Sequence, residues 1–170
     1  MVSICDFPCV GFSGSRSLSG VSRAALSVAA SSVSPSASVC VGCAGGVDEF
    51  FRSQFPRARV FRASSFGVGR GAFARRSVAV VSAVVSAGGC WVSFPSSACP
   101  VGLVPSASSS RCFSGGGSGS WASLAFALGS GGACFVCLPA GVSVPAGWGL
   151  SSVGGGWFAS SPVPAQLSLF

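Results

Sequence analysis

Four short segments of the chain carry residue types that suit the binding of an anion. They are 13–16 (SGSR), 42–48 (GCAGGVD), 75–76 (RR) and 115–120 (GGGSGS). Glycine lets a backbone approach a phosphate closely, and the free amides of a helix N-terminus point at it. Arginine keeps its charge and binds phosphate through a planar fork. Each segment alone also fits a flexible turn or a solvated helix face; together they predict a phosphate-binding crevice.

The charged residues limit the chemistry of such a crevice. The 170 residues include no His or Lys, so the general bases reduce to cysteine and the carboxylates Asp6, Asp48 and Glu49. All ten basic residues are Arg, and the net charge is +7. A positive chain favours an acidic partner such as a nucleotide or nucleic acid. Tyr, Thr and Asn are absent as well, and all five missing types share adenine in their codons, so the absences alone indicate no function.

The nine cysteines include two C-x-x-C pairs, Cys40/Cys43 and Cys134/Cys137. Both pairs fall on or beside predicted buried strands, and a long gap separates them, so small buried hydrophobic residues fit better than a zinc site. We expect no metal and no cofactor. No charged segment followed by an apolar run resembles a secretory signal, and the reduced thiols of the cytoplasm are expected.

The elements that must position the four segments alternate along the chain. Strands are predicted at 9–12, 38–41, 59–63, 90–94 and 133–138, and helices at 18–33, 47–55, 71–87 and 118–128, with a long loop over 95–117. This alternation predicts parallel strands joined by helical crossovers, which is an α/β fold with a single Rossmann-like domain. The turns that leave the carboxyl ends of such strands converge on one crevice, and we expect all four segments there.

The sequence changes character after Pro139, where Gly, Pro, Ser and Trp dominate without helical or alternating order. We expect a domain over 1–139, an irregular wrap with a proline-containing tether over 140–165, and a separate peptide over 166–170. Trp148 and Trp157 are expected to pack the wrap onto the domain, with base stacking as the alternative. The apolar run 77–87 is shorter than the roughly 20 residues that span a bilayer, so no membrane contact is expected.

A resemblance to a known superfamily emerges from GFSGSR, GCAGGVD, FARRS and GGGSGSWAS, which occur in that order. The chain resembles, over about residues 9–139, the superfamily that joins the DNA-processing protein A family with the LOG-type nucleotide hydrolases. The resemblance implies a Rossmann-like sheet that binds a nucleotide or single-stranded DNA by its phosphates, and members that pair as homodimers. The matching positions are Ser15, Arg16, Gly45, Gly46, Arg75, Arg76, Gly117, Gly119 and Ser120, and Asp48 is expected to join them.

One position departs from the LOG-type pattern. Those hydrolases carry a catalytic Glu three residues after the glycine-rich element, where this chain has Ser123. Asp48 is the only substitute, and it can instead orient a ribose hydroxyl or cap its own helix. Binding without catalysis is therefore expected. A nucleotide sensor or a LOG-like phosphoribohydrolase that acts on a small nucleotide is the alternative.

The last five residues resemble the pentapeptide by which bacterial polymerases and repair proteins reach the DNA polymerase III β sliding clamp. In such a peptide a glutamine amide hydrogen-bonds at the groove entrance, and apolar side chains fill a preformed pocket. The residues are Gln166, Leu167, Ser168, Leu169 and Phe170. The alternatives are that they fold back onto the core, or that the chain is a clamp-interaction module whose crevice has no role. We expect a DNA-replication or recombination protein recruited to the clamp by this peptide.

Overall fold

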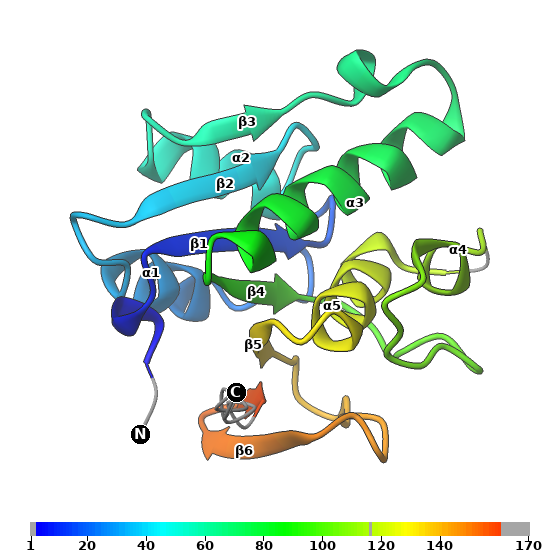
Figure 1. Cartoon of the computed structure of the whole chain (residues 1–170). Coiled ribbons are helices and arrows are strands. Elements are labelled where there is room, and N and C mark those ends of the chain that lie inside the picture. The colour runs from blue at the N-terminus through cyan, green and yellow to red at the C-terminus, as the bar shows by residue number, and fades with distance from the viewer. Residues whose placement is uncertain (1–2, 116, 161–170) are drawn as a thin grey trace, which may run out of the picture.

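The computed structural model describes residues 3–115 and 117–160, and they form one mixed sheet with helices on both faces (Figure 1). The strand order is β3-β2-β1-β4-β5-β7-β6. Five strands are parallel: β1 (Cys9–Gly14), β2 (Ser38–Gly42), β3 (Arg59–Phe61), β4 (Cys90–Phe94) and β5 (Ala133–Cys137). β7 (Trp157–Ser160) runs antiparallel to β5, and β6 (Leu150–Gly154) runs antiparallel to β7. The predicted Rossmann-like α/β fold is confirmed.

The helices form two layers, each with its own apolar core. α1 (Arg23–Ser31) and α2 (Val47–Gln54) cover one face of the sheet, and α3 (Arg70–Ser86) and α5 (Gly119–Gly129) cover the other (Figure 1). A short helix, α4 (Ser109–Cys112), lies in the long connection before α5, and 3-10 turns occupy Ile4–Asp6 (η1) and Ala63–Phe66 (η2). No helix in 3–115 or 117–160 is long and apolar enough to cross a bilayer.

The central strands are apolar on both faces, as parallel strands covered by two helical layers require. All five residues of β4 are buried, with Trp91 in the core under α3 and α5 and Val92 in the core under α1 and α2. Gly11 on β1 makes room for Trp91, because a Cβ there would lie 2.5 Å from the indole Cζ3. Gly11 and Trp91 are partners in the register of β1 with β4, so the glycine allows the indole to pack over β1.

β1 and β4 are the neighbours at which the order of the sheet reverses. The crossovers from β1 through α1 and α2 lie on one face, whereas α3 and α5, on either side of β4 in sequence, lie on the other. In open α/β sheets a ligand crevice forms at this switch point, outside the carboxyl ends of the strands. The fold thus places the β1–α1 turn and the start of α5 beside one another.

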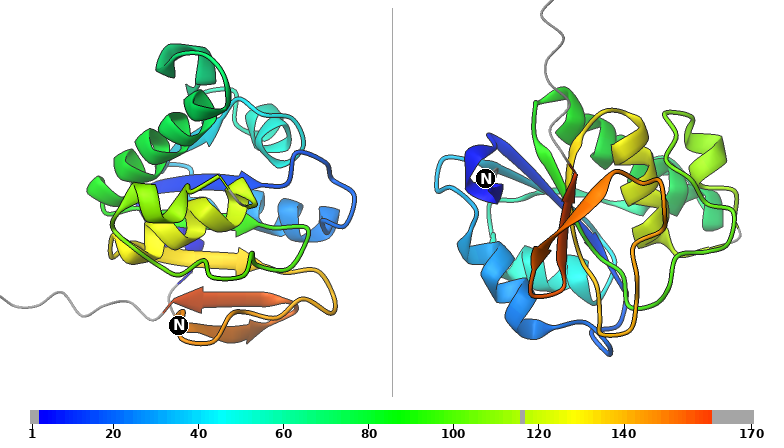
Figure 2. Two further views of the ribbon diagram at one scale, coloured as in Figure 1. Left: turned by 90° about the vertical axis from the view of Figure 1, so that its right-hand side faces the viewer. Right: turned by 90° about the horizontal axis from the view of Figure 1, so that it is seen from below.

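The irregular wrap predicted over 140–165 is wrong for residues 150–160, which form the β6–β7 hairpin at the edge of the sheet (Figure 2). Gly154, Gly155 and Gly156 turn the hairpin with φ of 98°, 60° and 80°. These residues form strands because β7 pairs with the edge of β5. No alternation of apolar and polar side chains predicts strands there. The Ser160 hydroxyl also accepts the Cys134 N–H at 2.8 Å.

The two tryptophans of this segment pack inward, as predicted. Trp148 is 5% exposed and meets Trp121 edge-on, with ring centroids 5.5 Å apart. Trp157 packs edge-on against Phe94 at 5.4 Å. Trp148 is therefore too buried to stack a nucleobase. The tether at 162–165 and the peptide at 166–170 lie outside the described residues.

Candidate functional site

A cavity of about 630 Å³ opens at the carboxyl ends of β1 and β4, between α3 and α5. Its walls come from the β1–α1 turn, from α3, from the connection between β4 and α5, and from the first turn of α5. Small-molecule sites typically occupy roughly 300–1,000 Å³. The cavity is therefore large enough for a nucleotide-sized ligand, and it lies where the fold predicts a crevice.

The N-terminus of α5 supplies hydrogen-bond donors to this cavity. Ala122 N–H donates to Ser118 O at 3.0 Å as the first bond of the helix. The amides that precede Ala122 in the helix have no partner within it. The Ser118 side chain makes no capping bond and instead pairs its hydroxyl with that of Ser120 at 2.7 Å. Gly117, Gly119 and Ser120 line the cavity, where the helix dipole favours an anion.

Two arginines flank an aromatic ring on the opposite wall. The Arg16 guanidinium lies 4.8 Å from the ring centroid of Phe73, and the Arg76 guanidinium lies 5.8 Å from it. All three side chains line the cavity. Phe73 and Arg76 are three positions apart on α3, so they share one face of the helix. The face of the ring attracts both cations and keeps them beside the same cavity.

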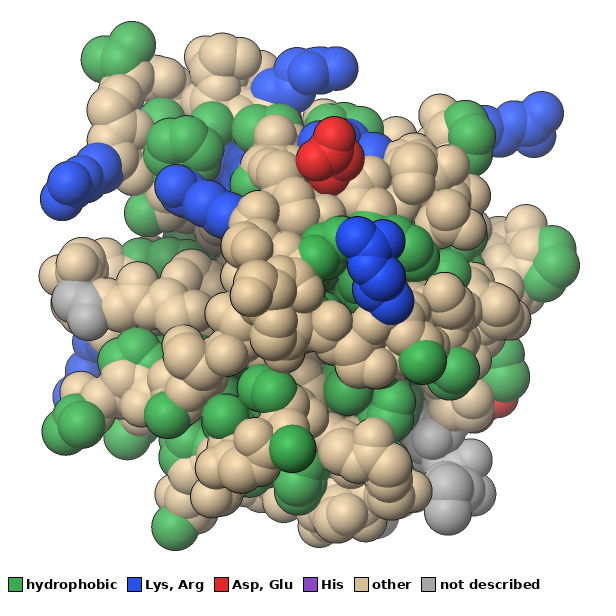
Figure 3. Space-filling model, turned by 180° about the vertical axis from the view of Figure 1, so that it is seen from behind, with side chains coloured by type: hydrophobic (Ala, Val, Ile, Leu, Met, Phe, Trp, Pro, Cys, Tyr) green, Lys and Arg blue, Asp and Glu red, His purple; other side chains and the backbone are tan. Residues whose placement is uncertain are grey.

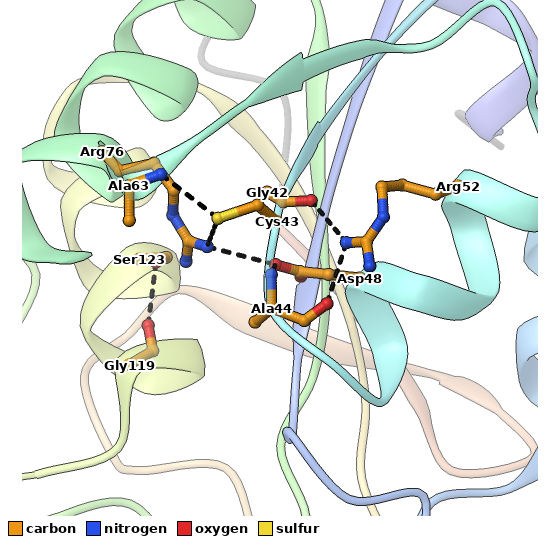
Figure 4. Close-up of polar contacts among 9 residues, drawn as sticks. All are labelled: Gly42, Cys43, Ala44, Asp48, Arg52, Ala63, Arg76, Gly119 and Ser123. Carbon is orange, nitrogen blue, oxygen red and sulfur yellow. Dashed lines mark hydrogen bonds and ion pairs between the residues drawn. The ribbon is translucent and has the colours of Figure 1, made fainter. Parts of the chain in front are cut away.

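Arg76 also forms an ion pair with Asp48 on α2 (Figure 4). Arg76 Nη1 lies 3.5 Å from Asp48 Oδ2, and the side chains are only 12% and 6% exposed. Asp48 Oδ2 accepts the Ala44 N–H at 3.1 Å as well. Burial raises the pKa of Asp48 above its ordinary value, and the attraction of Arg76 and the Ala44 hydrogen bond offset this only in part.

Arg52 on α2 hydrogen-bonds the backbone of the turn between β2 and α2. Its Nη1 donates to Gly42 O and to Ala44 O, both at 2.8 Å (Figure 4). Because Asp48 binds the same turn through Ala44, two side chains of α2 fix the backbone at the end of β2. The shape of this turn is therefore supported by contacts within the protein.

The Cys43 sulfur contacts Arg76, the arginine that forms the ion pair with Asp48. It accepts the Ala63 N–H at 3.2 Å and a hydrogen bond from Arg76 Nη1 at 3.6 Å (Figure 4). Partial burial opposes ionisation of the thiol, but the Ala63 amide and the charge of Arg76 outweigh it, so the pKa of Cys43 lies below its ordinary value. Arg76 is thus shared between a carboxylate, a thiol and the cavity.

The structure brings most of the predicted site residues together and leaves three aside. Ser15, Arg16, Asp48, Arg76, Gly117, Gly119 and Ser120 line the cavity, whereas Gly45, Gly46 and Arg75 do not. Arg75 donates its Nε–H to Phe66 O at 2.7 Å. Successive helical residues point about 100° apart, and this bond directs the Arg75 side chain towards η2, whereas Arg76 lines the cavity.

Gly46 does not line the cavity, and glycine is needed there for the conformation of the turn. Its φ is 66°, and a Cβ there would collide with the backbone of Ser15 and Arg16. The Val47 N–H donates to Ser15 O at 3.0 Å at the same point. The two turns therefore pack directly on each other, and Gly45 lies exposed beside them.

Phe73 and Arg111 are among the lining residues that sequence reasoning missed. Arg111 is the single charged residue after Arg76 in the entire sequence, and this isolation was a usable signal. Phe73 carried none, because an aromatic residue near a helix start ordinarily joins a core. Metal ligation finds no support in the part of the chain that the structure describes, where no three His, Cys, Asp or Glu side chains are grouped.

Comparison of the chain with protein-family models, with curated proteins and with solved structures finds no match.

Proposed function

We propose that this protein binds a phosphate-bearing ligand, a nucleotide or the backbone of single-stranded DNA, in the crevice at the switch point of the sheet, and catalyses no hydrolysis there. The observation that carries the proposal is the convergence of the α5 N-terminus with Arg16 and Arg76 on one cavity. Unpaired helix amides together with guanidinium groups form a strong site for phosphate oxygens.

The charges of the lining support an anion over a neutral ligand. In the described residues, three arginines line the cavity, Arg16, Arg76 and Arg111, and the single carboxylate is Asp48. Asp48 is engaged by Arg76 and by the Ala44 N–H. The net field inside the crevice is therefore positive, which raises the local concentration of an anionic ligand.

The same residues argue against hydrolysis. Ser123, at the position of the LOG-type glutamate, is 2% exposed and donates its hydroxyl back to Gly119 O at 2.8 Å. Asp48 has its carboxylate committed to the turn and to Arg76. Neither group is available to activate a water or to protonate a leaving base.

Binding is tested with a labelled single-stranded oligonucleotide by fluorescence anisotropy across a salt series. The salt-dependence slope is expected to decrease by roughly 0.7 for each phosphate contact that is removed. Arg16→Gln and Arg111→Gln are expected to weaken binding and to lower this slope. Arg23→Gln removes an exposed arginine on α1 that does not line the cavity, so it is expected to bind as the unmodified chain does.

Nucleoside monophosphates distinguish the possible ligands. Retention of a monophosphate that displaces the oligonucleotide supports nucleotide binding, and release of free base identifies a hydrolase and overturns the non-enzymatic proposal. Failure to bind both the oligonucleotide at low salt and any monophosphate removes the proposal altogether.

Recruitment to the DNA sliding clamp is the second part of the proposal, and the sequence of residues 166–170 is its support. A pull-down with clamp is expected to retain the full chain and to lose a chain that ends at residue 165. Leu169→Ala with Phe170→Ala removes two apolar anchors and is expected to abolish retention, while Ser168→Ala leaves it intact. Equal retention of the shortened and full chains contradicts this part.

A further inference from the structure

The two edges of the sheet differ in their protection against pairing with another strand. β3, at one edge, is three residues long and lies in a segment that contains Arg57, Arg59 and Arg62. The Arg59 guanidinium lies 4.6 Å from the ring centroid of Phe61. A short strand that carries charge resists edge-to-edge association.

β6, at the other edge, has no such protection from charge or proline. Its five residues, Leu150–Gly154, are all uncharged, and the last four are exposed, with Val153 at 42%. In the described part of the chain, β7 is its single partner strand. The irregularity of the ladder lies between Ser152 and Gly154, beside the hairpin turn, and leaves Leu150–Ser152 in regular register. An edge of this kind offers free N–H and C=O groups.

The charges of the molecule are segregated away from β6. All thirteen charged residues lie within 1–111, so β5, β6, β7 and their connections carry none. In the view from behind, the arginine and acidic side chains lie mainly in the upper half, away from the end of the sheet where β6 lies (Figures 1 and 3). With a net charge of +7, two copies repel each other least when their uncharged ends meet.

We propose that two copies of this chain associate through antiparallel pairing of β6 with β6 of a second copy, which joins both sheets into one. Two identical strands paired in this way are related by a two-fold axis, the commonest symmetry of protein dimers. The second copy brings a strand that is already formed and carries no charge. An extended peptide from another protein must instead lose conformational freedom when it binds, which makes it the weaker candidate.

Sedimentation equilibrium of the full chain tests this pairing over a concentration series. A reversible monomer–dimer equilibrium is expected. Ser152→Lys places like charges on both sides of the two-fold axis and is expected to raise the dimer dissociation constant by about tenfold or more. Val28→Lys adds the same charge to a side chain on α1 that is 57% exposed, and it is expected to dimerise like the unmodified chain.

Ser151→Lys is a second edge variant, and circular dichroism establishes that each variant remains folded. A full chain that stays monomeric at all concentrations overturns the proposal. So does dimerisation of both folded edge variants with unchanged affinity, because the interface then lies elsewhere. The test is independent of ligand binding, since β6 lines no part of the cavity.

Discussion

Asp48 on α2 and Arg76 on α3 meet across the end of β2, with Arg76 Nη1 3.5 Å from Asp48 Oδ2. The two helices cover opposite faces of the sheet, so the ion pair joins the layers at the rim of the crevice. It lies directly on Gly42, the last residue of β2. Through this pair the fold holds one guanidinium of the proposed binding site in place before a ligand binds.

The buried carboxylate of Asp48 is expected to make stability depend on pH. Its pKa is raised in the folded state above the ordinary value of 3.8, so the folded protein holds this proton more tightly than the unfolded chain. The free energy of unfolding should therefore fall as pH rises from about 3.8 through the raised pKa, and level off above it. Urea denaturation at a series of pH values measures this fall.

Asp48→Asn is expected to remove that fall, because an amide does not titrate. Glu49→Gln, at the exposed neighbouring position, removes an acidic group from the same turn of α2 and should keep the fall. A pH profile of Asp48→Asn that parallels that of the unmodified chain would show that Asp48 is not the group responsible.

Gly42 is expected to tolerate no side chain, because the ion pair occupies the space where a Cβ would lie. That Cβ would be 2.7 Å from Arg76 Nη1 and closer still to Asp48 Oδ2. Gly42→Ala should lower the free energy of unfolding by about 1–3 kcal/mol, the usual cost of overpacking, and should weaken ligand binding by displacing Arg76. Urea denaturation and the anisotropy titration measure the two effects.

Gly45→Ala is the matched control for Gly42→Ala. It lies three residues away in the same turn, and its nearest neighbour to an added Cβ is Arg16 O at 3.6 Å. The change in stability should stay within about 0.5 kcal/mol. Equal destabilisation by the two substitutions would mean that the flexibility of the turn, and not the ion pair, makes glycine necessary at residue 42.

The fold was predictable because strand and helix signals alternate along most of the chain. Buried runs such as Cys90–Phe94 need apolar residues on both faces, and this need leaves a clear signature in sequence. The β6–β7 hairpin left no such signature. Its residues are mostly small, and its order comes from pairing with β5, whose free edge exists only after the sheet has formed.

The site was predictable at the level of segments and less so for individual residues. Topology alone places the turn after β1 beside the start of α5, so Arg16 and Ser120 were found. Gly46 looked like a residue for phosphate contact, but the packing of one turn against another decides its place. How closely these two turns approach each other is a property of the tertiary structure and is not visible in the sequence pattern. For Arg75 and Arg76, the exact start of α3 decides which one faces the cavity.

Cys43 is expected to react faster with iodoacetamide than Cys99, although both are half-buried. The thiolate is the nucleophile; the pKa of Cys43 is lowered by the Ala63 amide and by Arg76 against the effect of burial, whereas burial raises the pKa of Cys99. Mass spectrometry of the alkylated protein at pH 7 measures both rates. Arg76→Gln should raise the pKa of Cys43 and slow its alkylation while Cys99 is unaffected. Arg76→Lys keeps the charge and should preserve much of the rate, so equal slowing by both substitutions would assign the effect to altered packing.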